Sequence, residues 1–217
     1  MKKLIAMGLT VIMTAVAVCG CDSSDSGNDA KKSDNQTKQQ AVKVIDVDLT
    51  SEEYAFGVDK NKPELLTQVN DFIKEIKDNG TFDEICNKYF GGGNPTPVKS
   101  EKLDTSKDQL LVATNASFEP FEYMKGDSYY GIDMEIAAAL AKKLNKELVI
   151  QNMEFDSVCL SVGQHKSDIA MTGLTIKEDR KKYVNFTDSY YNAAQRLIVK
   201  GDSTEFDNCK DLSLIHI

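Results

Sequence analysis

Three short stretches of the sequence carry side chains that could bind a small polar ligand, and each follows an apolar run that predicts a β-strand. Aromatic and amide groups follow the first run, an aromatic group the second, and hydroxyls, a glycine and a guanidinium the third. Ligands of open α/β sheets bind outside the carboxyl ends of the strands, so these loops would meet at one edge. The candidate ligand-binding residues are Asn115, Phe118, Phe121, Phe155, Thr172, Gly173, Thr175 and Arg180.

Arg180 and the aromatic candidates each have a plainer interpretation. Arg180 could be a solvated helix charge among nearby lysines, although the TGLT turn before it favours an anchoring role. Phe118 and Phe155 could be core residues, but each lies just past a predicted strand end. Phe121 fits either role. Glu122 is expected to be solvated or to cap a helix.

The elements that must position these loops lie in residues 108–199, where strands and helices alternate. The runs QLLVAT, ELVIQ and DIAM predict strands, and QRLIV predicts a further strand beginning near Gln195. GIDMEIAAALAKKL and DSVCLSVGQ predict helices, and another is expected to start near Lys177. This order is typical of an α/β fold with a mostly parallel sheet between helices, a three-layer α/β/α arrangement.

Residues 41–93 form a second strand-and-helix segment. VKVIDV and EYAFGV predict strands. Pro63 can begin a helix, because its missing N–H costs nothing there, and an apolar residue then recurs every three or four positions until Gly80 can end the helix. Thr81 and Glu84 have the spacing of a capping box for a second, shorter helix.

The start of the chain predicts a signal peptide followed by a tether. Residues 1–20 hold a short positive region and an apolar stretch that suits a signal peptide better than a membrane span. Cys21 stands where that stretch stops and is expected to be lipidated; a cleaved signal with incidental cysteines is the alternative. Residues 21–40 contain one alanine and no aliphatic or aromatic side chain, so they predict a disordered tether.

Composition narrows the classes of partner. The formal net charge is −8, with lysines and glutamates interspersed, so a nucleic-acid partner is not indicated. Three of the five cysteines, Cys86, Cys159 and Cys209, lie beyond the signal without zinc-like spacing, and there are two histidines, so no metal site is expected. Cys86 and Cys159 are expected to be buried thiols, and a disulfide between them is left open.

Residues 109–199 resemble the opening part of the extracellular solute-binding proteins of family 3, which serve ABC importers of polar amino acids. GIDMEI, followed by Leu140, Ala141 and Leu144, fits the signature of that family at every constrained position. VATNASFEPFEY matches its first strand and loop, and DIAMTGLTIKEDRKKYVNFTDSYY matches its third strand and ligand loop. The resemblance implies the first lobe of a periplasmic-binding-protein-like fold.

The same resemblance implies a function. The protein would be a monomeric lipoprotein, anchored to the extracytoplasmic face of the bacterial cell membrane. It would bind a free amino acid between two lobes and deliver it to the transmembrane permease subunits of an ABC importer. It would need no cofactor and would not be an enzyme.

Residues 53–93 resemble the final segment of the same family, although here they come first. EEYAFGV is like the strand that returns from the second lobe, and the residues after it are like the closing helices. We therefore expect a circular permutation in which residues 41–93 complete the lobe of residues 108–199, joined by a linker over residues 94–107. A tandem duplication with a truncated first copy is the alternative.

The pattern of the family also implies roles for the polar candidates. Arg180 would grip the α-carboxylate of the ligand as a two-pronged, charge-assisted partner, and Thr175 would add its hydroxyl and backbone N–H. Thr172 and the carbonyl of Gly173 would accept hydrogen bonds from the α-ammonium. Because a hydrogen bond to a charged group contributes roughly 1.5–3 kcal/mol, Arg180 would be the anchor.

The remaining candidates would surround the side chain of the ligand. Phe118 and Phe155 would sandwich its stem and exclude water, which strengthens the polar contacts. Many relatives carry aspartate where this chain has Asn115, and the neutral amide removes a preference for basic ligands. The substitution favours a neutral polar or acidic amino acid.

The resemblance further implies a second lobe that closes about a hinge. The hinge is expected just after Val199 and the second lobe near Cys209, so residues 200–217 would hold only its start. The last six residues, LSLIHI, resemble a translated sequencing adaptor, and a longer protein is therefore expected. A lone lobe offers half a cleft and would bind far more weakly than two.

Two other functions remain open from the sequence. An enzyme on the same scaffold, like the dehydratases that act on cyclohexadienyl acids, would need a placed general acid, and none is evident in this lobe. His165 is expected at a helix end, away from the loops. A sensor ectodomain would need a transmembrane helix.

Overall fold

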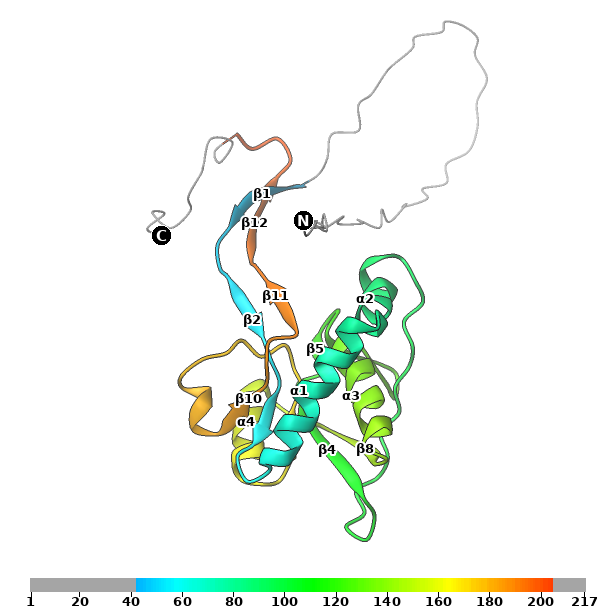
Figure 1. Ribbon diagram of the computed structural model, residues 1–217. Helices are drawn as coiled ribbons and strands as arrows, with labels where there is room; N and C mark the ends of the chain where they lie inside the picture. Colours follow the sequence, from blue (N-terminus) through cyan, green and yellow to red (C-terminus); the bar gives the residue numbers. More distant parts are fainter. Residues whose placement is uncertain (1–41, 205–217) are drawn as a thin grey trace, which may run out of the picture.

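A five-stranded mixed sheet forms the centre of the computed structural model, which describes residues 42–204 (Figure 1). Its strand order is β10–β3–β9–β4–β8. The strands are β3 (Gly57–Asp59), β4 (Gln109–Thr114), β8 (Glu147–Asn152), β9 (Ile169–Ala170) and β10 (Val184–Phe186). β4 is parallel to β8 and β9, whereas β3 is antiparallel to both of its neighbours, so four of the five strands run in one direction.

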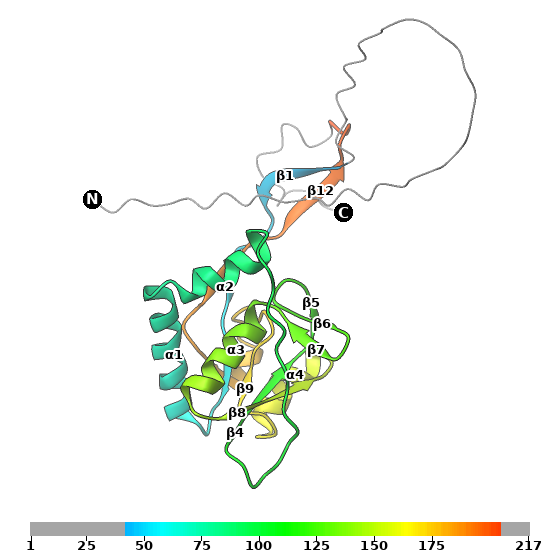
Figure 2. The same cartoon turned by 90° about the vertical axis from the view of Figure 1, so that its right-hand side faces the viewer.

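Helices cover both faces of this sheet (Figure 2). They are α1 (Pro63–Asp78), α2 (Thr81–Phe90), α3 (Ile132–Lys143) and α4 (Phe155–Gly163). The first three share one apolar cluster with the sheet, and α4 packs in a second cluster with Ala113, Ala170 and Val184. The predicted three-layer α/β/α lobe with a mostly parallel sheet is confirmed.

The segments at the two ends of the lobe are interleaved. β3, from residues 41–93, lies between β9 and β10, where Val58 pairs with Ile169 on one side and with Asn185 on the other. The apolar stripe of α1 packs in the same cluster as Leu110 and Val112 of β4. The two segments therefore build one core, as expected if one completes the other.

Two further strand pairs form a ribbon that leads away from the lobe (Figure 1). β1 (Val42–Asp48) pairs with β12 (Arg196–Lys200), and β2 (Glu52–Tyr54) pairs with β11 (Tyr191–Ala193), both antiparallel. QRLIV thus forms a strand, but outside the main sheet, and the hinge predicted after Val199 falls at the end of the ribbon. The predicted signal, tether, Cys21, Cys209 and residues 205–217 lie outside the described residues.

The junction of α1 and α2 confirms one local prediction and overturns another. α1 begins at Pro63, and Gly80 follows its end with a φ of +83°. Gly80 is also the residue before α2, so Thr81 already lies in the helix and its hydroxyl cannot cap. The predicted capping box with Glu84 is therefore wrong, and Asn79 Oδ1 accepts from the Thr81 N–H at 2.9 Å instead.

The segment around Lys177 also departs from prediction. The expected helix is a single 3₁₀ turn, η1 (Arg180–Lys182), because the chain must enter β10 at Val184 and no room remains for a longer helix. A three-stranded sheet after β4 was not predicted. It consists of β5 (Ser117–Phe118), β6 (Glu122–Lys125) and β7 (Ser128–Tyr130).

The linker of residues 94–107 is tied to the lobe along its course. Val98 is buried and exchanges backbone hydrogen bonds with Tyr129 at 2.8 and 3.0 Å. The Glu101 N–H donates to the Leu148 carbonyl at 2.8 Å. The stretch is a connection without helix or long strand, as predicted, but part of it is bound to the lobe instead of exposed.

Cys86 and Cys159, for which a disulfide was left open, lie in different apolar clusters. Cys86 packs against the cluster of α1, α2 and α3, whereas Cys159 lies in the cluster of α4 on the other face of the sheet. Both are free thiols, and burial raises the pKa of the Cys86 thiol to about 12. Cys86 and Cys159 therefore do not pair.

Candidate functional site

The loops that follow β4, β8 and β9 enclose a hollow of about 330 Å³, together with residues of the ribbon. Seven of the eight predicted ligand residues line it: Asn115, Phe118, Phe155, Thr172, Gly173, Thr175 and Arg180. Its other lining residues, which the sequence did not single out for the site, are Glu52, Tyr54, Ser117, Glu122, Lys177 and Gln195. The hollow lies where the topology of the sheet predicts a ligand.

Arg180 is held in place without a charged partner. It opens the η1 turn, where its Nη1 donates to the Thr175 carbonyl at 2.9 Å and its guanidinium lies 5.0 Å from the centre of the Phe155 ring. Within residues 42–204 no carboxylate lies at ion-pair distance from it. The hollow therefore presents a positioned positive charge that is available to an anion.

The predicted aromatic residues divide between the hollow and the core. Phe118 and Phe155 line the hollow from two different loops, with exposed fractions of 44% and 38%. Phe121 is buried and stacks on Phe118 at 5.6 Å between ring centres, so it supports the site instead of lining it. Gly173 has a φ of +51°, and a Cβ there would lie 3.1 Å from the Phe118 ring, so a larger residue would be strained at this position.

The side chain of Asn115 is engaged by two neighbouring loops. Its Nδ2 donates to the Met153 carbonyl at 2.8 Å, and its Oδ1 accepts from the Ser117 hydroxyl. The backbone N–H of Asn115 donates to Thr172 Oγ1 at 3.1 Å. The amide thus joins the first and second loops, and the arrangement gives no support to a role in selecting the ligand.

Two buried acids lie next to the site, and the sequence did not reveal either. Glu122 is 1% exposed, so the expectation that it is solvated or capping is wrong. Its Oε1 accepts from the Thr172 hydroxyl at 2.8 Å, and its Oε2 is buried without a partner in the described part of the chain. Asp133 is fully buried and accepts from the Gly173 N–H at 2.9 Å and from the Tyr190 hydroxyl at 2.6 Å.

Burial changes the protonation of these acids. Burial, followed by the charge of Asp133, raises the pKa of Glu122 to about 10, and the Thr172 hydrogen bond only partly opposes the rise. Burial also raises the pKa of Asp133, against the hydrogen bonds of Tyr190 and Gly173. The two acids interact, and Glu122 is the one that keeps its proton at neutral pH because Asp133 has two donors. The sequence did not make these perturbed carboxyl groups evident.

A third acid lies on the lining of the hollow. Glu52 of β2 accepts from Gln195 Nε2 at 2.8 Å through Oε1, and its Oε2 lies 3.4 Å from the Thr175 hydroxyl. The sequence placed Glu52 in a strand but could not bring it to the site, because Thr175 is 123 positions away.

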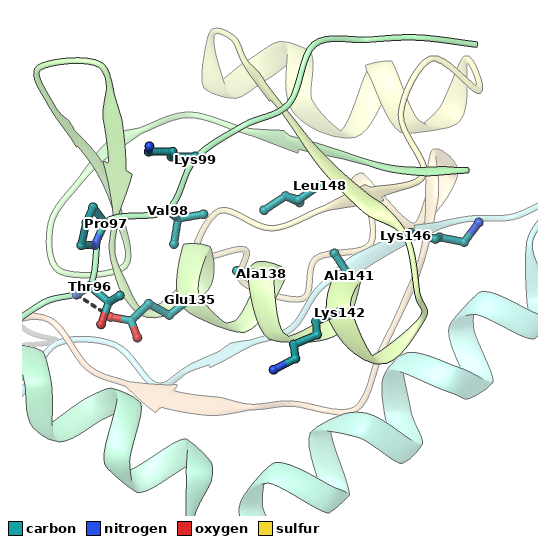
Figure 3. A pocket seen from close by; sticks show the side chains of 10 residues that line it. All are labelled: Thr96, Pro97, Val98, Lys99, Glu135, Ala138, Ala141, Lys142, Lys146 and Leu148. Carbon is teal, nitrogen blue, oxygen red and sulfur yellow. Dashed lines mark hydrogen bonds between the residues drawn. The ribbon is translucent and has the colours of Figure 1, made fainter. Parts of the chain in front are cut away.

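A different hollow, of about 470 Å³, lies between the linker and α3 (Figure 3). Glu135 lies at its edge and accepts from the Thr96 N–H at 3.0 Å and the Tyr89 hydroxyl at 2.8 Å, and it pairs with Lys88. None of the predicted ligand loops reaches it. It is therefore not the candidate site.

The described residues hold neither a metal cluster nor a membrane span. Within residues 42–204 no three His, Cys, Asp or Glu side chains are placed to bind a metal ion, and no helix there is long and apolar enough to cross a bilayer. His165 lies beyond the end of α4, as predicted, and its Nδ1 is 2.8 Å from Asp59 Oδ2 in β3. That contact joins the two chain segments.

Comparison with known proteins decides the family. The family described as bacterial extracellular solute-binding proteins, family 3, matches residues 10–92 and residues 110–211. The chain belongs to this family. Its members are extracytoplasmic proteins that bind solutes. The family is the one that the sequence motifs resemble.

Individual relatives in this family bear amino-acid names. The chain is similar to the arginine-binding extracellular protein ArtP of Bacillus subtilis, with 38% identity over 109 residues, covering 50% of this chain and 42% of the relative. The matched part spans less than half the length of the curated relatives.

Two solved structures show similarity over part of the chain. The arginine-bound form of domain 1 from TmArgBP is 32% identical, with a TM-score of 0.38, covering 46% of this chain and 86% of that one. An ancestral cyclohexadienyl dehydratase is 32% identical, with a TM-score of 0.33, covering 35% of this chain and 32% of that one.

Proposed function

We propose that this family 3 protein is the amino-acid-binding lipoprotein of an ABC importer and delivers its ligand to a membrane permease. The observation that carries the proposal is Arg180, a guanidinium without a charged partner in residues 42–204, held beside a hollow by Thr175 and Phe155. A fixed guanidinium suits a carboxylate, which it can bind through two parallel hydrogen bonds.

The hollow suits the zwitterionic part of an amino acid. Arg180 and the backbone N–H of Thr175 would bind the α-carboxylate. Thr172 and the Gly173 carbonyl would accept from the α-ammonium, on the side where the buried acids lie. Phe118 and Phe155 would cover the stem of the side chain, since both rings are partly exposed there.

We further propose that the side chain of the ligand is basic, with arginine the first candidate. The curated relatives that support this are named for arginine and histidine. Glu52 supplies a carboxylate on the lining of the hollow. The sequence favoured a neutral or acidic ligand because of Asn115. The amide of Asn115 is instead engaged by the Met153 carbonyl and the Ser117 hydroxyl.

Membrane attachment and a second lobe are parts of the same proposal. Cys21 would carry the lipid anchor, and the ribbon of β1 and β12 would lead to a second lobe that closes over the hollow. The protein would act as a monomer. A lone lobe would bind its amino acid much more weakly than the two-lobed form, which calorimetry on both forms would measure.

We also propose that the chain order is a circular permutation of the family order. The placement of β3 between β9 and β10 supports this, because a separate copy would have no reason to fill that gap. Proteolytic cleavage near Leu103, which is 57% exposed, should leave the two segments associated in gel filtration. Separation into independently folded pieces would favour a tandem duplication.

A binding role is preferred to an enzyme on the same scaffold. A dehydratase needs a proton donor that reaches its substrate. Glu122 holds a proton, but its side chain is 1% exposed and its Oε2 is covered. Incubation with a cyclohexadienyl acid tests the alternative, and turnover that depends on Glu122 would establish it.

A thermal-shift screen of the twenty amino acids tests the proposed function. Basic amino acids should raise the melting temperature most, because ligand that binds only the folded state stabilises it. Arg180→Ala should abolish the shift. Lys181→Ala is the matched control, since Lys181 follows Arg180 in the same turn and pairs with Glu178. No shift with any amino acid at millimolar concentration would contradict the proposal.

A further inference from the structure

Two hydrogen-bond donors of the ligand loop, the Thr172 hydroxyl and the Gly173 N–H, are engaged by buried acids, and the role inferred for them rests on the proposed function. The hydroxyl of Thr172 donates to Glu122 of β6, and the N–H of Gly173 donates to Asp133 of α3. Both donors of adjacent loop residues are thus taken up by buried carboxyl groups on two different elements. The other hydrogen bond of Thr172 Oγ1 is one that it accepts, from the Asn115 N–H.

We propose that Glu122 and Asp133 act as a pair of positioning residues that make the Thr172 side chain and Gly173 an acceptor-only surface, and so select an ammonium group on the ligand. With the Thr172 hydroxyl and the Gly173 N–H engaged, the Thr172 side chain and Gly173 offer only oxygen lone pairs to the hollow. Lone pairs favour a cationic donor and disfavour a second carboxylate. The pair thereby sets which end of the zwitterion lies here, while Arg180 takes the other end.

The charge of the pair is consistent with this role. Asp133 is the better stabilised anion, since it accepts from Gly173 and from the Tyr190 hydroxyl, whereas Glu122 accepts from Thr172 alone. No basic side chain pairs with either acid within the described range of the chain. One negative charge therefore lies under the loop, close enough to favour an ammonium.

Glu122 also fits poorly into a purely structural role. Its Oε2 is buried without a partner among residues 42–204 although the residue lines the hollow, and an unpartnered buried polar atom lowers stability. A hydrophobic residue would remove that cost at this position. Retention of a carboxyl group is explained if its acceptor is needed to hold the Thr172 proton.

Calorimetry with two probes tests the inference: L-arginine, and 5-guanidinopentanoate, which is arginine without its α-amino group. Glu122→Leu should weaken L-arginine binding at least tenfold and change binding of the second probe less than about threefold, because only L-arginine has the ammonium. Glu122→Gln keeps an acceptor for Thr172 and should stay within about threefold of the unsubstituted chain for both probes.

Thr172→Val is a second variant that keeps the test decisive if Glu122→Leu does not fold. It replaces the hydroxyl with a methyl group of similar size and should show the same selective loss for L-arginine. Equal weakening of both probes would show a merely structural role and overturn the inference. Glu122→Gln as weak as Glu122→Leu would also overturn it, because a carboxyl group rather than a neutral acceptor would then be required.

Failure of the proposed function gives a different result. In that case the unsubstituted chain would bind neither L-arginine nor any other amino acid, and the inference would fall with the function on which it rests. If the unsubstituted chain binds an amino acid and the variants show no difference between the probes, only the inference on Glu122 and Asp133 is overturned.

Discussion

Helix α3 carries two buried carboxyl groups that face different regions. One region neutralises its carboxyl group with a cation and hydrogen-bond donors, and the other supplies no cation. Asp133 and Glu135 are two positions apart, so their side chains leave the helix about 200° apart. Glu135 faces the linker and α2, where Lys88, Tyr89 and the Thr96 N–H all donate to it (Figure 3). Asp133 faces the ligand loop, with Glu122 beside it and no basic partner in the described residues.

The difference separates a structural acid from acids of the binding site. Glu135 joins three elements, and both of its oxygens are satisfied by hydrogen bonds or charge. The Glu122–Asp133 pair is incompletely satisfied and has raised pKa values, because burial is not offset by a cation. Strongly perturbed acids in a hollow are typical of functional sites. The contrast therefore favours the region of Glu122 as the site.

Removing the structural acid should have the largest effect on stability. Glu135→Ala removes the ion-pair partner of Lys88, which keeps only Thr96 Oγ1, and the acceptor of the Tyr89 hydroxyl; because the Lys88 side chain is about a third exposed we expect a loss of about 2–3 kcal/mol. Urea unfolding measures it. The control is Glu75→Ala, whose partner Lys143 is exposed, and which should cost less than about 1 kcal/mol. Equal losses would erase the contrast between the two regions.

Replacing the site acid should change how stability depends on pH. Because the pKa of Glu122 is raised in the fold, the folded chain binds a proton that the unfolded chain has lost between about pH 4.5 and pH 10. Its contribution to stability is therefore present at low pH and is lost as pH rises, by up to about 1.4 kcal/mol per pH unit. Glu122→Gln lacks this proton and should gain stability relative to the unsubstituted chain as pH rises.

Urea unfolding of both proteins between pH 5 and pH 9 measures this difference. The other titratable groups that interact with Glu122 are Asp133, Tyr54 and Tyr190, and all three remain in the variant. Parallel stability curves would mean that Glu122 does not carry the extra proton, and the two regions would then be electrostatically alike.

The contrast also shows how far the sequence alone could predict this molecule. Helices α1 and α3 and strand β4 follow from local periodicity, and the rule for strand ends placed Phe118, Thr172 and Arg180 in the loops that line the hollow. These signals are local, or depend on a rule about the edge of a sheet. The mixed sheet covered by helices agrees with the fold that the family resemblance implies.

The buried acids could not be predicted in the same way. Glu122 is 50 positions from Thr172, and Asp133 is 40 from Gly173, so their roles exist only after tertiary packing. One local signal was present: Glu122 stands between Phe121 and Tyr123 in an aromatic run, where a solvated charge is unexpected. The helix expected near Lys177 failed because β10 begins too soon after it, which is also a tertiary constraint.

The smallest effect is expected at Asn115, on the other side of the site. Asn115→Asp loses the hydrogen bond to the Met153 carbonyl but keeps an oxygen that accepts from the Ser117 hydroxyl, so it should change the affinity for L-arginine or L-lysine less than about threefold. Titration calorimetry on the variant measures both ligands. A tenfold or greater gain in affinity would show that residue 115 selects the side chain of the ligand. A neutral ligand would then again be favoured for the unsubstituted chain.

The central claim, that Arg180 binds the α-carboxylate of an amino acid, is tested most directly with L-arginine and its methyl ester. The account predicts that the ester, which lacks the carboxylate charge, binds the unsubstituted chain at least tenfold more weakly than L-arginine, and that Arg180→Ala binds the two equally weakly. Equal affinity of the unsubstituted chain for the ester and the free amino acid would contradict it.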